Sequence, residues 1–371
     1  MTNKIFFALL FFSSLLVHPK LPYIKYGFHN LLVPLFAVVL FCLNVRHLKD
    51  VIKYHRKALI FGILLFIWIW ICSFFSNFKE TAIKFTIKYS AYPIVLFSFL
   101  LLRSSYHYFI FRFLTLIAIF GIIEAFFPNL FIFHLLRPPE SLGVYPRISS
   151  FLQSPNIFGV LMACGLILGL ILKVSKIELY FSILLFIINL SLSSSRNGWL
   201  VFILGLFLAS LYNKRITLTK ISLLICIFLF LIASFQVSRV RLGLRSLFFD
   251  SARITLWKAA LYEVSKRPIT GIGLRVFDEH VASKIFEKKG YHTHNLFLNI
   301  LVELGIPGFF LSLIFIYSLL KKVDFYNPLA SIPITIVFFS QMVDFFIHDF
   351  TFTIISLYFL AFASNSKIER I

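Results

Sequence analysis

The sequence predicts an all-α polytopic membrane protein with about twelve transmembrane helices and one large outer loop that contains a further helix. Three observations support this fold class. Hydrophobic residues make up 60% of the chain, whereas soluble domains have roughly 45–50%. The mean hydropathy is +0.92. Apolar runs close to the roughly 20 residues that a helix needs to cross a bilayer alternate with short basic segments.

Twelve apolar runs are candidate spans. They cover approximately residues 4–18, 29–45, 58–76, 84–102, 107–127, 156–172, 177–193, 198–212, 219–236, 295–320, 328–347 and 350–365. The first run resembles a signal peptide, but no small-residue cleavage site follows it, so we expect an uncleaved span. Residues 1–371 are therefore expected to form a single integral membrane domain.

The charge pattern predicts the orientation of these spans. The chain has 36 Lys and Arg against 15 Asp and Glu, and no nucleic-acid-binding motif accompanies this excess. Short segments on one side of the proposed membrane carry sixteen basic residues, and those on the other side carry six. Because Lys and Arg in short loops mark the cytoplasmic side, we expect both termini to be cytoplasmic.

Two longer segments are expected on the outer side. Residues 128–155 are rich in proline and predict an extended cover over the membrane mouth. Residues 237–294 hold eleven basic and five acidic residues. This excess favours an anionic ligand, although attraction to anionic lipid headgroups is an alternative. Apolar residues at helical spacing predict a helix over 249–264, and Thr270–Gly273 predicts a turn.

The remaining charges and the cysteines give weaker signals. Charged residues within the proposed spans are Lys84, Lys88, Arg112, Glu124, Asp344 and Asp349. They do not form the buried file of charges that an ion or proton pathway needs, so a transporter lacks its expected signature. The cysteines Cys42, Cys72, Cys164 and Cys226 lie in apolar runs without metal or disulfide spacing, and we expect them to be packing residues.

Arg196 is a candidate ligand for phosphate. It is predicted at the outer end of the eighth span, preceded by serines and followed closely by Gly198. Small residues allow helices to approach closely, and a helix N-terminus next to an arginine suits a phosphate oxygen. The alternative is an arginine that simply extends to the lipid headgroups.

His294 is the candidate catalytic base. It lies at the start of an apolar run, directly after the basic loop and before Asn295, and histidine is the side chain best suited to accept a proton near neutral pH. With His292 it could also form a His-x-His metal pair. No carboxylate is near in sequence, since Glu303 lies about two turns further on, so we expect no metal and no other cofactor.

Three ordered motifs resemble those of the O-antigen ligase and O-antigen polymerase superfamily of bacterial envelope glycosyltransferases. The first is Ser195-Arg196-Asn197-Gly198-Trp199-Leu200. The second runs from Ser251-Ala252-Arg253 through Trp257 to Pro268 and Gly271-Ile272-Gly273. The third is His294-Asn295 followed by Gly305 and Gly308. The number of spans and one large periplasmic loop before the histidine are also similar.

This resemblance implies metal-independent, inverting transfer of a glycan from undecaprenyl diphosphate, on the periplasmic face of the bacterial inner membrane. The expected acceptor is a sugar of lipid A-core, as in an O-antigen ligase. Arg196 and Arg253 would hold the donor diphosphate, and His294 would deprotonate the acceptor hydroxyl. Supporting roles are expected for Arg147, Trp257, Arg275, His292 and Asn295.

Two alternatives stay open at this point. The first is an O-antigen polymerase or another envelope-polysaccharide polymerase, in which the acceptor is a second lipid-linked unit. The second is a transporter or flippase of a lipid-linked or anionic solute, which would be favoured if Arg196, Arg253 and His294 lay far apart. The expected partners are the lipid-linked donor, lipid A-core and membrane lipid, without nucleic acid.

Overall fold

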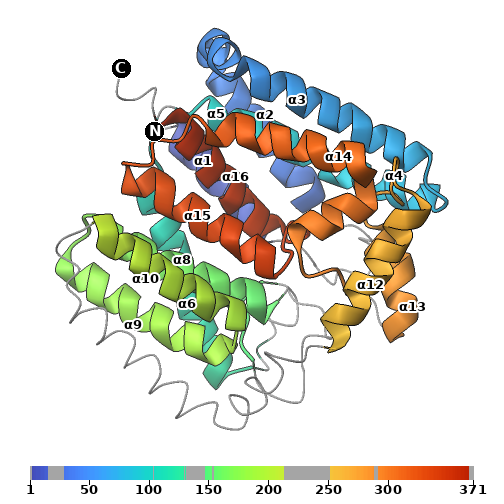
Figure 1. The fold of residues 1–371 in the computed structure, drawn as a ribbon. Helices are drawn as coiled ribbons and strands as arrows, with labels where there is room; N and C mark the ends of the chain where they lie inside the picture. The colour runs from blue at the N-terminus through green and yellow to red at the C-terminus, as the bar shows by residue number, and fades with distance from the viewer. Residues whose placement is uncertain are drawn as a thin grey trace.

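A computed structural model describes residues 2–15, 29–102, 104–128, 130, 147–152, 154–212, 251–287 and 291–366 of the chain (Figure 1). Within these ranges every regular element is a helix, which confirms the expected all-α class. The expected span at 219–236 lies outside the described residues. So do most of the loop at 128–155 and the parts of the loop at 237–294 that fall on 237–250 and 288–290.

The first half of the chain forms helices close to the expected spans. They are α1 (Thr2–Ser14), α2 (His29–Leu43), the short η1 (Val45–His47), α3 (Leu48–Phe74), α4 (Lys79–Tyr89), α5 (Ala91–Leu100) and α6 (His107–Phe126). The expected span at 84–102 was wrong in one respect, because two helices meet there at Ser90. Pro93 lies three residues further on, in the first turn of α5, and its ring and missing N–H disfavour a continuous helix through this point.

The second half contains the site-bearing helices. They are α8 (Pro155–Ile171), α9 (Lys176–Ser193), α10 (Arg196–Tyr212), α12 (Ser251–Lys266), the π-helical η3 (Phe277–Ala282), α13 (Ser283–Phe286), α14 (Leu296–Leu320), α15 (Pro328–Val343) and α16 (Phe350–Asn365). The expected loop helix is therefore present as α12.

Four described helices are long and apolar enough to cross a membrane, namely Val45–Phe74, which joins η1 to α3, and α6, α9 and α14. Five shorter apolar helices are Asn30–Leu43 in α2, and α8, α10, α15 and α16. This pattern supports a membrane protein, and the count of twelve spans stays a prediction.

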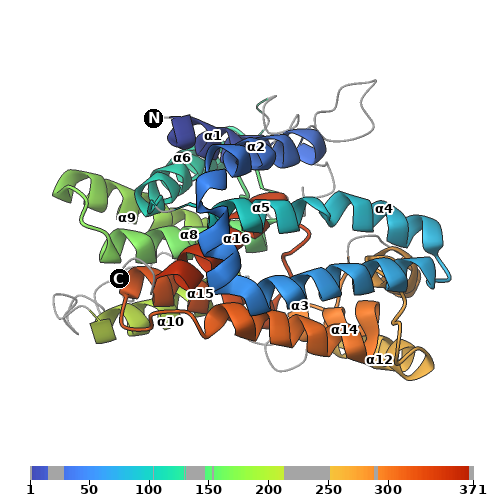
Figure 2. The same cartoon turned by 90° about the horizontal axis from the view of Figure 1, so that it is seen from above.

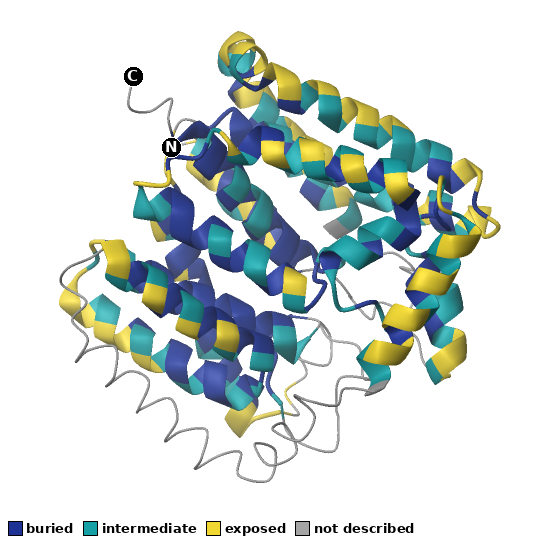
Figure 3. Ribbon diagram, viewed as in Figure 1, coloured by how far each residue is buried: buried dark blue, intermediate teal, exposed yellow. Residues whose placement is uncertain are grey.

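The helices form one bundle around α8 and α16, most of whose residues are buried (Figure 3). On one side, α8 packs against α9 and α10. Helix α15 joins this group to α16, and α16 packs against α5 (Figure 1). On the other side, α14 and α3 run side by side, as Figure 2 also shows.

Helix α14 is interrupted at Gly305, where the backbone has φ 69° and ψ −176°. The turn after α12 fills this interruption: Ile306 donates its N–H to the carbonyl of Pro268 at 2.8 Å, and Ile272 donates to that of Val302 at 3.0 Å. A Cβ at Gly271 would lie 2.6 Å from the carbonyl oxygen of Glu303. The two glycine motifs therefore form one joint, which we call the Gly305 joint (residues 268–273 and 302–306).

Candidate active site

The site is built on a short turn, His292–Asn295, that leads into α14. Asn295 is the N-cap of α14, and its side-chain oxygen accepts the N–H of Leu298 at 3.0 Å. The hydroxyl of Thr293, which is fully buried, donates to the carbonyl of Asn295 at 2.9 Å. These bonds fix the turn at the first residue of a long helix. We call the end of the bundle where it lies the histidine end.

His294 has a left-handed backbone with φ 53°, a conformation that costs free energy in a residue other than glycine. His292 supports it, because its Nδ1 accepts the backbone N–H of His294 at 3.2 Å. Burial lowers the pKa of His292 to about 3, with a smaller contribution from His294, so the His292 ring is neutral and able to accept this bond. His292 therefore helps to hold the catalytic candidate in its strained position.

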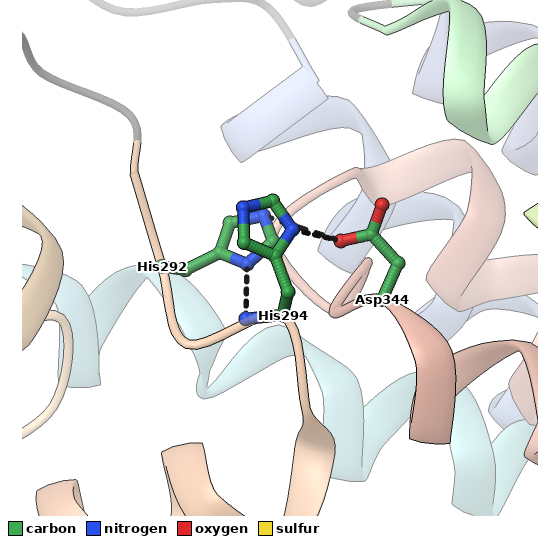
Figure 4. Close-up of side chains that lie close together, drawn as sticks. All are labelled: His292, His294 and Asp344. Carbon is green, nitrogen blue, oxygen red and sulfur yellow. Dashed lines mark hydrogen bonds and ion pairs between the residues drawn. The ribbon is translucent and has the colours of Figure 1, made fainter. Parts of the chain in front are cut away.

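Asp344 is the partner of His294 (Figure 4). Its Oδ1 lies 2.7 Å from Nδ1 of His294, and the carboxylate, at the C-terminal end of α15, is only 2% exposed. Burial by itself would raise the pKa of Asp344, but the hydrogen bond from His294 and the neighbouring basic groups lower it to about 2. An ionised carboxylate only accepts. Nδ1 therefore carries the proton, and Nε2 is the basic nitrogen of the neutral ring.

The expectation that no carboxylate lies near the histidines was wrong. It rested on distance along the chain, and Asp344 is remote in sequence but adjacent in space. The charge at Asp344 was visible in the sequence as one of the few acids at the end of a predicted span. An acid at the end of a predicted span was the sequence feature that could have identified Asp344 as a candidate site residue.

Arg253 and Trp257 connect α12 to the backbone next to Asp344 and next to His294. Nη1 of Arg253 donates to the carbonyl of Val343, the residue before Asp344, at 2.9 Å. Nε1 of Trp257 donates to the carbonyl of Thr293, the residue before His294, at 2.8 Å. Helical spacing puts both side chains on one face of α12. The guanidinium is therefore held at the histidine end, beside Asp344.

Arg147 reaches Asp344 through Asn156. Its Nη2 donates to Oδ1 of Asn156 at 2.7 Å, and Nδ2 of Asn156 donates to Oδ2 of Asp344 at 3.2 Å. Its Nε also donates to the carbonyl of Ser193 at 2.8 Å. The carboxylate of Asp344 thus accepts from a histidine on one oxygen and from an amide on the other, which satisfies a buried charge.

Arg196 begins α10 directly after the serines that Arg147 contacts, and it is partly exposed. The next residue, Asn197, donates to the carbonyl of Ser340 on α15 at 2.9 Å, one turn before Asp344. These contacts put the start of α10 at the histidine end together with Arg253 and His294. A cavity shared by the three residues stays a prediction.

Arg275 lies behind the histidine turn in a second polar cluster. Its Nη1 forms a 2.7 Å ion pair with Oδ2 of Asp278, and its backbone N–H donates to Glu303 at 2.9 Å. Nε2 of His348 lies 3.1 Å from the same oxygen of Asp278. Burial raises the pKa of Asp278, an effect that Arg275 partly opposes. Arg275 therefore holds the loop after α12 against α14 and is already paired with a carboxylate.

Two histidines and an aspartate at this site could also bind a cation. One ligand atom each from His292, His294 and Asp344 lies within 4.8 Å of the others. Ligands of a tetrahedral zinc ion, each about 2.0–2.2 Å from the metal, are separated by roughly 3.3 Å. The 2.7 Å between His294 and Asp344 is instead a hydrogen-bond distance, so the geometry favours a histidine–carboxylate pair.

The comparison with family models agrees with the motifs. Residues 181–313 match the family described as O-antigen ligase, a segment that includes Arg196, Arg253 and His294. This match confirms the resemblance to the O-antigen ligase and polymerase superfamily, and it implies a glycosyltransferase-type enzyme of envelope polysaccharide synthesis. A comparison with curated proteins gives no match.

Proposed function

We propose that the protein transfers a glycan from undecaprenyl diphosphate to an acceptor hydroxyl at the periplasmic face of the inner membrane. The observation that carries this proposal is the His294–Asp344 hydrogen bond, which leaves Nε2 as the basic nitrogen of a histidine that lies within the segment matching the O-antigen ligase family. Transfer to lipid A-core is the favoured reaction. Polymerisation of lipid-linked units is the second candidate within the same family.

The proposed step needs a base and a stabilised leaving group. The acceptor oxygen attacks the anomeric carbon, and its proton passes to Nε2 of His294. The bond between the anomeric carbon and the phosphate oxygen breaks, and its electron pair leaves with undecaprenyl diphosphate. In-line attack inverts the anomeric configuration. Asp344 stabilises the imidazolium that forms, as a carboxylate does in a Ser-His-Asp triad.

The arginines are proposed to stabilise the diphosphate as it gains negative charge. Guanidinium groups bind phosphate through two parallel hydrogen bonds, and preorganised positive charge lowers the barrier most where negative charge develops. Arg253 is held beside Asp344 by the carbonyl of Val343, and Arg196 starts a helix whose N-terminal dipole adds positive potential. Arg147 is proposed to support both arginines through its hydrogen bonds to Asn156 and to the backbone carbonyls of the serines before Arg196.

An envelope-polysaccharide profile of a deletion strain tests the function. Loss of polymer on lipid A-core, with lipid-linked polymer still made, supports a ligase. Accumulation of single repeat units supports a polymerase. Complementation with His294→Ala should fail while wild type succeeds. An unchanged profile in the deletion strain would contradict both enzymes.

A further inference from the structure

Helix α12 has an exposed face that the catalytic proposal does not explain. Leu256 and Ala260 are buried against the bundle, whereas Leu261 is 55% and Tyr262 59% exposed. Ile254 and Trp257, also exposed, extend this apolar face towards the start of the helix. A continuous exposed apolar face on a helix indicates contact with a partner or a membrane.

The depth of α12 relative to the bilayer follows from its contacts with α14. A hydrocarbon layer about 30 Å thick takes about 20 helical residues. About 20 residues counted back from Leu320, the last residue of α14, end near residue 301. The edge of the hydrocarbon layer at the histidine end therefore lies near residue 301. The turn after α12 hydrogen-bonds to Val302 and Ile306, within the Gly305 joint. The C-terminal end of α12 is therefore level with this boundary.

The charges on the same face suit an anionic surface. Lys258 and Lys266 are exposed, and Nζ of Lys266 lies 4.0 Å above the ring of Tyr262. Within α12 the single carboxylate, that of Glu263, lies towards the partly buried side. Lysines with aromatic and aliphatic residues, and without acids, are typical of helices that lie in the interface of a membrane with anionic lipids.

We propose that the face of α12 formed by Ile254, Lys258, Leu261, Tyr262 and Lys266 binds the anionic lipid surface of the leaflet at the histidine end. This proposal rests on the crossing of the bilayer by α14 and is independent of glycosyl transfer. The bonds from α12 to Val343 and Thr293 connect this face to the active site. Lipid contact would therefore hold the histidine turn at the depth of the headgroups, where a lipid-linked diphosphate lies.

Spin-label accessibility in vesicles tests the contact. The full-length protein, with its four cysteines replaced, carries a nitroxide at Leu261→Cys in phosphatidylcholine–phosphatidylglycerol vesicles. Labels at Ile63, exposed on α3, and at Asp50 are the lipid and water references. We expect the Leu261 label to favour oxygen over a water-soluble nickel complex several-fold more than the Asp50 label does. Accessibility equal to that of Asp50 would overturn the proposal and leave the face for a protein partner.

A second measurement keeps the native cysteines. Phosphatidylglycerol added to detergent-solubilised protein should raise the thermal midpoint of the wild type more than that of Lys258→Glu/Lys266→Glu. The matched control is Lys49→Glu/Lys53→Glu, on exposed residues of α3, which should respond as the wild type does. Equal shifts in the wild type and the α12 variant would contradict the proposed attraction to anionic headgroups.

Discussion

The backbone of His294 is strained, and hydrogen bonds on both sides of this residue hold its turn in place. Its φ of 53° is kept by the acceptor Nδ1 of His292 and by the contacts of Thr293 with Asn295 and Trp257. Strained residues persist only where surrounding contacts determine them, and they are common at active sites. His292 is therefore better explained as a support for the backbone of His294 than as one member of a metal pair.

Replacing Asp344 with Asn should reduce kcat by roughly 10²–10⁴-fold, the range for general acid–base catalysis. Asparagine keeps the size of the side chain but removes the charge that stabilises the imidazolium and that fixes the proton on Nδ1. Single-turnover transfer in reconstituted vesicles measures the effect. Donor binding, measured separately, should change little.

Asp349→Asn is the matched control for that substitution. Asp349 lies in the same connection between α15 and α16 and caps α16 by accepting the N–H of Phe352 at 2.8 Å. Asparagine caps helices about as well as aspartate, so this variant should retain transfer. Equal losses in both variants would mean that the connection as a whole, rather than the charge on Asp344, is needed.

The lowered pKa of Asp344 predicts a pH dependence of stability. The pKa falls from the ordinary value of 3.8 to about 2, which corresponds to a stabilisation on the order of 2 kcal/mol. Because the folded-state pKa is the lower one, this stabilisation is complete above about pH 4 and is lost as the pH falls towards 2. Thermal midpoints of the wild type should fall more steeply over that interval than those of Asp344→Asn. Parallel curves would contradict the assignment.

At the scale of elements, the Gly305 joint explains why two separate glycine motifs occur in the sequence. The backbone angles of Gly305 lie in a region that is essentially restricted to glycine, and a Cβ there would collide with the carbonyl of Ile269. Gly305→Ala should therefore destabilise the protein by at least 1–3 kcal/mol, roughly the cost of such strain, and lower transfer because the joint positions both α12 and α14.

Gly62→Ala is the comparison variant for Gly305. Gly62 is inside α3, and a Cβ there would meet the end of the Phe315 ring at 3.0 Å, a contact that a small ring movement can relieve. Its thermal midpoint should stay close to that of the wild type, and that of Gly305→Ala should be clearly lower. Similar midpoints for the two variants would argue against the joint.

The sequence predicted the elements of the site better than their contacts. Arg253 and Trp257 share a face of α12 because helical spacing requires it, whereas the capping of α14 by Asn295 is seen only in the structure. Asp344 was missed because its approach to His294 depends on how α15 packs against the rest of the bundle. The break at Gly305 was missed because an apolar run of normal length concealed it.

At the scale of the whole molecule, the apolar runs of the sequence predicted most of the described helices. Lipid-facing and core-facing residues are both apolar, so the runs mark helices without showing how they pack. This is why the division of the expected span at 84–102 into α4 and α5 was not predicted. The orientation of the bundle stays a prediction that depends on the basic short segments.

Metal chelation tests the choice between a histidine–carboxylate pair and a metal centre. Because the 2.7 Å separation of His294 and Asp344 is a hydrogen bond, treatment with EDTA followed by its removal should leave transfer by the purified protein unchanged. A loss that added zinc or another divalent cation restores would instead assign His292, His294 and Asp344 as its ligands.

The most direct measurement is glycan transfer by the purified protein in vesicles that contain an undecaprenyl-diphosphate-linked glycan and lipid A-core. His294→Asn is the decisive variant, because asparagine tolerates the left-handed backbone but cannot act as the base. We predict that it binds donor as the wild type does and fails to transfer glycan. Transfer at a near wild-type rate would contradict the assignment of His294 as the base.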